Sequence, residues 1–198
     1  MSDDSKTDLP ILPDPLAHET ILAQKAHILG VRGTIADIGL IRERLRALNG
    51  HEGVVAVLVR SDRILGELHV REAIRHAARL HRQDPAVQTS LAVDVLRFLG
   101  VCRQIEKALV RLGVTRGPIE GVLIVVGPIP VSTILLEIGL VGTDPRYGRP
   151  DDVLSALEVS AGARTPIDVI LEAMALLELD LPHPSPEPVV PVHASPGG

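Results

Sequence analysis

The sequence DVLRFLGVCRQIEKALVRLGV, residues 94–114, has a pattern that is typical of two short helices in direct succession. The second helix is expected to begin near Arg103 and to stop at Gly113. Its apolar residues at i, i+3, i+4 and i+7 form one face: Ile105, Ala108, Leu109 and Leu112. Its basic residues at i, i+4 and i+8 form another: Arg103, Lys107 and Arg111. This combination predicts a rigid scaffold that holds a polyanion.

The composition indicates a globular protein with an aliphatic core. Of the 198 residues, 45% are hydrophobic but only 1% are aromatic, so the core must consist of Leu, Ile, Val and Ala. The scarcity of aromatic residues argues against an RNA-binding sheet on which bases stack. Cys102 is the single cysteine, which excludes an internal disulfide and a thiolate metal site and fits a reducing cytoplasm.

The sequence offers no motif for catalysis or for a cofactor. The eight histidines lack a ligand spacing to a second His or Cys, and the chain has neither a phosphate-binding glycine loop nor a nucleophile elbow. We therefore expect no catalytic residue, no metal and no cofactor. The polar, acidic N-terminus and the absence of 18 consecutive apolar residues predict a cytoplasmic protein without a secretory signal or a membrane span.

Charge is distributed unevenly along the chain. Residues 60–116 carry eleven Lys/Arg and six Asp/Glu, a balance of 11 − 6 = +5, whereas residues 117–198 carry three Arg and eleven Asp/Glu, a balance of 3 − 11 = −8. Such asymmetry indicates one surface for an anionic partner and another for a neutral or basic partner. Chance clustering of surface charges is the alternative.

Runs of apolar and β-branched residues predict three strands, over residues 28–32, 54–59 and 122–126. Between the first two, a helix is expected to begin at a capping box of Thr34 and Asp37 and to stop at Asn49. A long helix should follow the second strand, with Ser61 or Asp62 as its cap.

The long helix is expected to run to about residue 82 and to carry a cationic row at i, i+4, i+8 and i+11: Arg71, Arg75, Arg79 and Arg82. Such a row is a candidate for contacts with RNA phosphates. The alternative is a solvated face on which Glu67 and Glu72 pair with the arginines.

The last predicted helix has a clear start, with Thr165 as N-cap, Pro166 at its first position and Asp168 three residues after the cap. It should run to about residue 180, after a short helix over residues 132–140 and a loop over 142–150. Because it is apolar on two sides, it is either deeply buried or shared with a partner protein. The candidate partner-binding residues are Val169, Ala173, Leu176, Leu177 and Leu179.

The order of these elements predicts a single α/β (α+β) domain with a small mixed sheet of about three to four strands covered by helices. The domain should span residues 21–181. Residues 1–20 and the proline-rich residues 182–198 are expected to be disordered tails.

Several segments, taken in order, resemble one protein family. They are the strand at Ile28–Gly33, the strand at Val54–Val59 with Ser61–Ile64 and Leu68-His69 after it, the segment from Asp94 through Arg103-Gln104-Ile105 to Gly113, the strand at Val122–Gly127, and the helix at Ile170–Leu179. Together they resemble the small kinase-binding subunit of the KEOPS complex, the PRPK-binding-protein family, in its archaeal form. The Arg-Gln-Ile segment is the most specific of them.

This resemblance implies a non-catalytic role in making N6-threonylcarbamoyladenosine in tRNA. A separate transferase subunit performs that chemistry, and a small atypical kinase-ATPase subunit supports it. The family binds the kinase-ATPase and captures tRNA near its 3′ CCA end. One departure concerns the residues before Arg-Gln-Ile: the family usually has an aromatic residue, a small residue and Gly there, whereas Phe98–Cys102 shifts the Gly by one place and adds bulk.

The tRNA-binding candidates are therefore Arg103, Gln104 and Lys107 together with the four-arginine row. Arg103 at a helix start can combine its guanidinium with backbone N–H groups to hold a phosphate, and the Gln104 amide can read a base edge or a 2′-OH. Alternatively, both residues brace the junction of two helices. The competing functional hypotheses are a protein-interaction adaptor without RNA contact and a small enzyme, for which the sequence shows no polar cluster.

Overall fold

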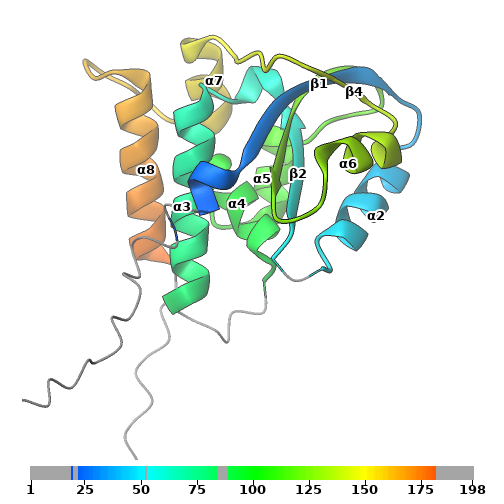
Figure 1. Cartoon of the computed structure of the whole chain (residues 1–198). Coiled ribbons are helices and arrows are strands. Elements are labelled where there is room, and N and C mark those ends of the chain that lie inside the picture. Colours follow the sequence, from blue (N-terminus) through cyan, green and yellow to red (C-terminus); the bar gives the residue numbers. More distant parts are fainter. Residues whose placement is uncertain (1–18, 20–21, 52, 84–88, 182–198) are drawn as a thin grey trace, which may run out of the picture.

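The computed structural model describes residues 19, 22–51, 53–83 and 89–181 (Figure 1). In this part of the chain, four strands form one sheet in the order β2-β3-β1-β4. The strands are β1 (His27–Ile35), β2 (Val55–Arg60), β3 (Gly117–Val126) and β4 (Val141–Thr143). The expected single α/β domain with helices on a small sheet is confirmed. All three strand pairings are antiparallel, so the sheet is not mixed in direction.

Helices cover both faces of the sheet. One face lies under α3 (Glu67–Gln83), α4 (Leu91–Leu99), α7 (Pro150–Leu157) and α8 (Pro166–Asp180), and its core includes Val57, Val122 and Phe98. The other face lies under α2 (Ile38–Leu48) and α6 (Val131–Ile138), and its core includes Leu58 and Leu123. Figure 1 shows these two layers on either side of the strands. Burial on both faces explains why β2 and the end of β3 are continuous apolar runs.

Two predicted helix starts are wrong. Thr34 belongs to β1, and Asp37 is itself the N-cap of α2, where its carboxylate accepts hydrogen bonds from the backbone N–H groups of Gly39 and Leu40. Ser61 and Asp62 do not cap the long helix. They lie in a short 3-10 turn, η1 (Ser61–Arg63), which precedes α3 by three residues.

The region expected to be a loop over residues 142–150 contains the edge strand β4 and the first residue of α7. Two helix boundaries agree with expectation: α5 (Ile105–Leu112) ends before Gly113, and α8 begins after Thr165, whose hydroxyl accepts from the Asp168 N–H. The expected tails lie almost wholly outside the described residues. Within the described ranges, no helix is long and apolar enough to cross a membrane.

Candidate functional site

The junction between α4 and α5 presents the Arg103-Gln104 pair at a helix start, as predicted. Gln104 occupies the N-cap position of α5 with an extended backbone, and its side chain makes no capping hydrogen bond. The Arg103 side chain is 57% exposed, with its Nη2 atom 3.2 Å from Asp180 Oδ2 at the end of α8. Because this ion pair is exposed, it leaves the guanidinium accessible to a further anion.

The turn before Arg103 is tightly built. A Cβ atom on Gly100 would lie 3.2 Å from the Cα and Cβ atoms of Ala108, so glycine at this position lets α4 and α5 approach closely. Val101 has φ 46°, the left-handed region in which a β-branched residue is strained. Gly at position 100 therefore serves the helix contact, and Val101 adopts the left-handed conformation that suits glycine.

Arg111 stabilises this turn through hydrogen bonds to the turn's backbone. Its Nη1 atom donates to the carbonyl oxygens of Gly100 at 2.7 Å and Val101 at 3.1 Å, and its Nη2 atom donates to Glu158. The residue is 9% exposed. Arg111 thus belongs to the predicted basic face but is buried, which corrects the expectation of a fully cationic surface on α5.

Glu158 neutralises two cations of α5. Its Oε2 atom lies 2.7 Å from Lys107 Nζ and 2.5 Å from Arg111 Nη2. Hydrogen bonds from Lys107 and Arg111 lower the pKa of this carboxyl below its ordinary value. Glu158 ends α7 with φ 58°, so a second residue in the left-handed region meets this junction.

A groove of about 440 Å³ lies between this junction and α8. Its lining from the junction is Val101, Cys102, Arg103, Gln104 and Lys107, and its lining from α8 is Ala173, Leu176, Leu177 and Asp180. The groove brings together three of the predicted tRNA-binding residues and three of the predicted partner-binding residues. An apolar floor with arginine, lysine and amide groups at the rim can hold a nucleotide by its base and by its phosphate.

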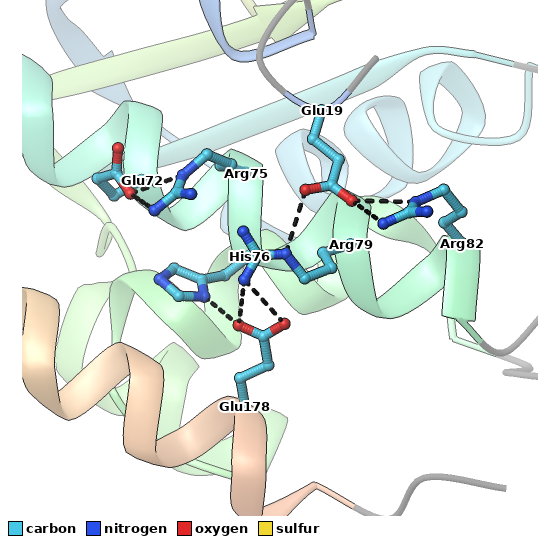
Figure 2. A network of polar contacts seen from close by, with 7 residues as sticks. All are labelled: Glu19, Glu72, Arg75, His76, Arg79, Arg82 and Glu178. Atoms are coloured by element: carbon cyan, nitrogen blue, oxygen red, sulfur yellow. Dashed lines mark hydrogen bonds and ion pairs between the residues drawn. The ribbon is translucent and has the colours of Figure 1, made fainter. Parts of the chain in front are cut away.

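The four-arginine row of α3 lies elsewhere, and each of its arginines forms an ion pair within the described chain. Figure 2 shows the pairs of Arg75, Arg79 and Arg82. Arg71 pairs with Glu67 and also donates to the backbone carbonyl oxygens of Ala23 and Gln24. Arg75 pairs with Glu72. The alternative in which Glu67 and Glu72 pair with the row is therefore confirmed, while RNA binding by the row stays a prediction.

The second half of the row joins three segments of the chain. Figure 2 shows Glu19 between Arg79 and Arg82, with Oε2 3.1 Å from Arg79 Nε and Oε1 2.6 Å from Arg82 Nη2. Glu19 is 1% exposed. Arg79 also pairs with Glu178 of α8, which accepts from His76 Nδ1 at 2.5 Å. The ion pairs of Arg79 and Arg82 therefore link Glu19 and α8 to α3.

Two buried acids that contact α3, Glu178 and Asp94, are stabilised as anions. Burial alone would raise the pKa of Glu178, but hydrogen bonds and charges from His76 and Arg79 outweigh burial and lower the pKa. Asp94 is fully buried, and bonds from His81, Thr89 and Arg97 likewise outweigh burial and lower its pKa. The partners of Asp94 lie 3 to 13 residues from it in the chain, whereas His76 and Glu178 are 102 residues apart, a separation that no local sequence signal reveals.

The predicted partner-binding residues of α8 divide into two groups. Val169 at 3% and Leu177 at 7% exposure are buried in the chain's own core, which corrects their assignment to a docking face, although Leu177 still borders the groove. Ala173 is half-buried. Leu176 and Leu179 are 57% and 74% exposed, so they form the accessible apolar part of α8.

Cys102 is buried as predicted, and burial raises the pKa of its thiol. Over the described ranges, no group of three or more His, Cys, Asp and Glu is arranged to hold a metal ion. The comparison with known proteins adds no assignment: the chain matches no protein-family model and no curated protein at a significant level.

Proposed function

We propose that this protein is a non-catalytic, cytoplasmic accessory subunit of the KEOPS complex, which modifies tRNA with N6-threonylcarbamoyladenosine. In this role it binds the small atypical kinase-ATPase subunit, recruits tRNA through its 3′ CCA end and reaches the threonylcarbamoyl-transferase subunit indirectly. The resemblance in sequence supplies the identity of the complex. The groove between the α4–α5 junction and α8 is the observation that carries the tRNA role.

The groove suits a single-stranded RNA end. Arg103 and Lys107 are 57% and 47% exposed beside it, which places two cations within reach of phosphates. Leu176 offers an apolar wall for a base, and the Gln104 side chain makes no capping bond, which leaves its amide available for a base edge or a 2′-OH. Arg103 and Lys107 must exchange Asp180 and Glu158 for phosphate, and because both acids are exposed this exchange costs little.

The accessible part of α8 supports the partner role. Leu176 and Leu179 lie on the same helix and are both largely exposed, and the apolar Ala175 that precedes Leu176 is exposed as well. Exposed leucines of this kind mark protein contacts more often than scattered single apolar residues do. The kinase-ATPase is proposed to cover Leu179, at the end of α8.

The internal pairing of the α3 arginines favours a second candidate, an adaptor without RNA contact of its own. Each of Arg71, Arg75, Arg79 and Arg82 already has a carboxylate partner among the described residues. In that case the cationic row stabilises the fold, and α8 alone carries the function. The two candidates differ in whether tRNA binds in the absence of any other subunit.

A gel-shift titration separates the candidates. Intact tRNA should bind, and tRNA lacking its CCA end should bind at least tenfold more weakly. Replacing Arg103 by Gln should weaken binding and reduce the slope of log K against log salt by about one. Arg164→Gln is the matched control, because Arg164 is 56% exposed, pairs with one exposed acid, Glu172, and precedes the opposite end of α8. Equal binding of both RNAs, or equal effects of both substitutions, contradicts the tRNA role.

The partner role has its own test. Leu179→Glu should abolish co-purification with the kinase-ATPase subunit, because a carboxylate would be forced into an apolar contact. Leu136→Glu is the matched control, since Leu136 is 82% exposed on α6 in the other helical layer. Loss of the partner from neither variant, or from both, argues against docking through α8.

A further inference from the structure

A second groove lies at the outer edge of the sheet, along β2. It has a volume of about 270 Å³ and runs between α2 in one helical layer and α4 with α5 in the other. Figure 1 shows α2 on one side of β2 and α4 and α5 on the other. Its walls are aliphatic: Ile38, Ile41 and Leu45 from α2, Val93 and Leu96 from α4, and Ile105 and Leu109 from α5. Helix α5 thus borders both grooves, with Lys107 at the first and Leu109 at the second.

The charged residues that line this groove have one sign. Arg42 and Arg46, one helical turn apart on α2, line it and are exposed. No acidic residue belongs to its lining, and neither arginine forms an ion pair within the described ranges of the chain. This contrasts with α3, where all four arginines of the row are paired. An occupant with two carboxylates one helical turn apart would form ion pairs with Arg42 and Arg46.

The edge of β2 is closed to an added strand. The Asn49 side chain accepts from the Ala56 N–H at 2.6 Å and donates to the Ala56 carbonyl oxygen at 3.0 Å, in the manner of a neighbouring strand. Further along, Val59 forms an isolated antiparallel bridge with Gly113. Because these contacts occupy the outer edge of β2, an occupant must bind through side chains and not by extending the sheet.

We propose that this groove docks an amphipathic helix of a partner protein, whose aliphatic residues are flanked by carboxylates one helical turn apart. The volume lies below the range of most small-molecule pockets, which is roughly 300–1,000 Å³, and suits two or three aliphatic anchors. Leu109, 37% exposed, and Val110, 84% exposed, continue the apolar surface outward along α5. This interface is separate from α8 and from the proposed tRNA groove, and it does not depend on the proposed function.

The test uses a fluorescein-labelled synthetic helix of about 18 residues, with leucines at i, i+4 and i+7 and glutamates one turn apart beside them. Anisotropy titrations compare it with a peptide in which lysines replace the glutamates and with one in which the leucines are scrambled. The protein variants are Arg42→Glu with Arg46→Glu, and Leu109→Glu. The matched control is Arg44→Glu with Arg116→Glu, which reverses two charges outside the groove.

The glutamate peptide should bind at micromolar concentration, and the lysine and scrambled peptides should bind at least tenfold more weakly. Reversing Arg42 and Arg46 should weaken binding about tenfold, since two exposed pairs are lost and repulsion replaces them. The control pair should change it less than twofold. Methyl NMR shifts should be confined to Ile38, Leu45, Leu109 and their neighbours.

Four outcomes overturn the proposal. Three concern the peptides: no binding of the glutamate peptide up to about 500 μM, which corresponds to a binding free energy of about 4.5 kcal/mol, equal binding of the lysine peptide, and methyl shifts located outside the groove. Concentration-dependent self-association that the Arg42 and Arg46 reversal abolishes would also overturn it, because a second copy would then be the occupant. Circular dichroism of each variant confirms that its helices are retained.

Discussion

His69 gives the sharpest quantitative prediction, because its buried ring can hold only the neutral form. The residue has no exposed surface. Its Nδ1 atom accepts from the Leu65 N–H at 3.3 Å, and its Nε2 atom donates to the Leu99 carbonyl oxygen at 3.2 Å. A proton on Nδ1 would therefore point at another donor. Burial lowers the pKa of His69 to about 4, with a smaller opposing contribution from the Leu99 carbonyl.

The magnitude and the sign follow from linkage. Between the ordinary pKa of 6.5 and about 4, the unfolded chain binds a proton at His69 and the folded chain does not. The contribution of His69 to the free energy of unfolding is therefore fully present above pH 6.5 and is lost as pH falls toward 4. The total loss is about 3 kcal/mol. Between pH 7.5 and 5.0 the expected loss is about 2 kcal/mol.

The assay is urea unfolding at constant ionic strength, followed by circular dichroism at pH 7.5, 6.5, 5.5 and 5.0. His69→Gln keeps one donor and one acceptor but cannot titrate, so its free energy of unfolding should depend less on pH by about 2 kcal/mol over this range. The pKa values of Asp94 and Glu178 are lowered from 3.8 and 4.5, so these acids contribute mainly below pH 5. Parallel pH profiles for the wild type and the variant would refute the reasoning.

Three further predictions concern stability, and each is measured as a change in the free energy of unfolding at pH 7.5. Gly100→Ala should cost about 1–3 kcal/mol because its Cβ would meet Ala108, and a loss below 0.3 kcal/mol would contradict the close approach of α4 and α5. Arg111→Met should cost about 2–3 kcal/mol, since two carbonyl oxygens lose their buried donor, whereas Arg116→Met, at an exposed site, should change stability by less than 0.5 kcal/mol. Asn49→Ala should cost about 1–3 kcal/mol and raise the tendency to aggregate on light scattering, and an unchanged tendency would mean that the β2 edge needs no cover.

Local signals predicted the parts of the fold that depend on neighbouring residues. The N-cap at Thr165 with Pro166 after it, and the helix that ends before Gly113, follow from backbone rules that operate within one or two turns. The apolar runs located three strands, although β3 extends five residues earlier than expected. The short edge strand β4 was not predicted, because its three residues, Val-Gly-Thr, are too few to show an alternating pattern.

The candidate binding residues were less predictable, because their charged side chains form ion pairs with residues from distant parts of the chain. The α3 arginines form a cationic row in sequence. In the structure, half of that row pairs with Glu19 and Glu178, which lie 60 and 99 residues from Arg79, and these ion pairs stabilise the fold. Periodicity placed Val169 and Leu177 on a possible docking face, and only the packing of α8 on α3 and α7 shows that they are buried. Arg103, Gln104 and Lys107 line one groove because all three lie within five residues, and their role in binding tRNA stays a prediction.

The contact between His76 and Glu178 has a consequence for synthesis on the ribosome. The two residues are 102 positions apart, so at about 5–20 residues per second α3 emerges roughly 5–20 s before its partner carboxylate exists. During that interval the apolar side of α3 that α8 later covers is open to water. A nascent chain paused between these points is therefore expected to expose an apolar surface of the kind that chaperones bind, and slow codons before α8 would prolong this exposed state.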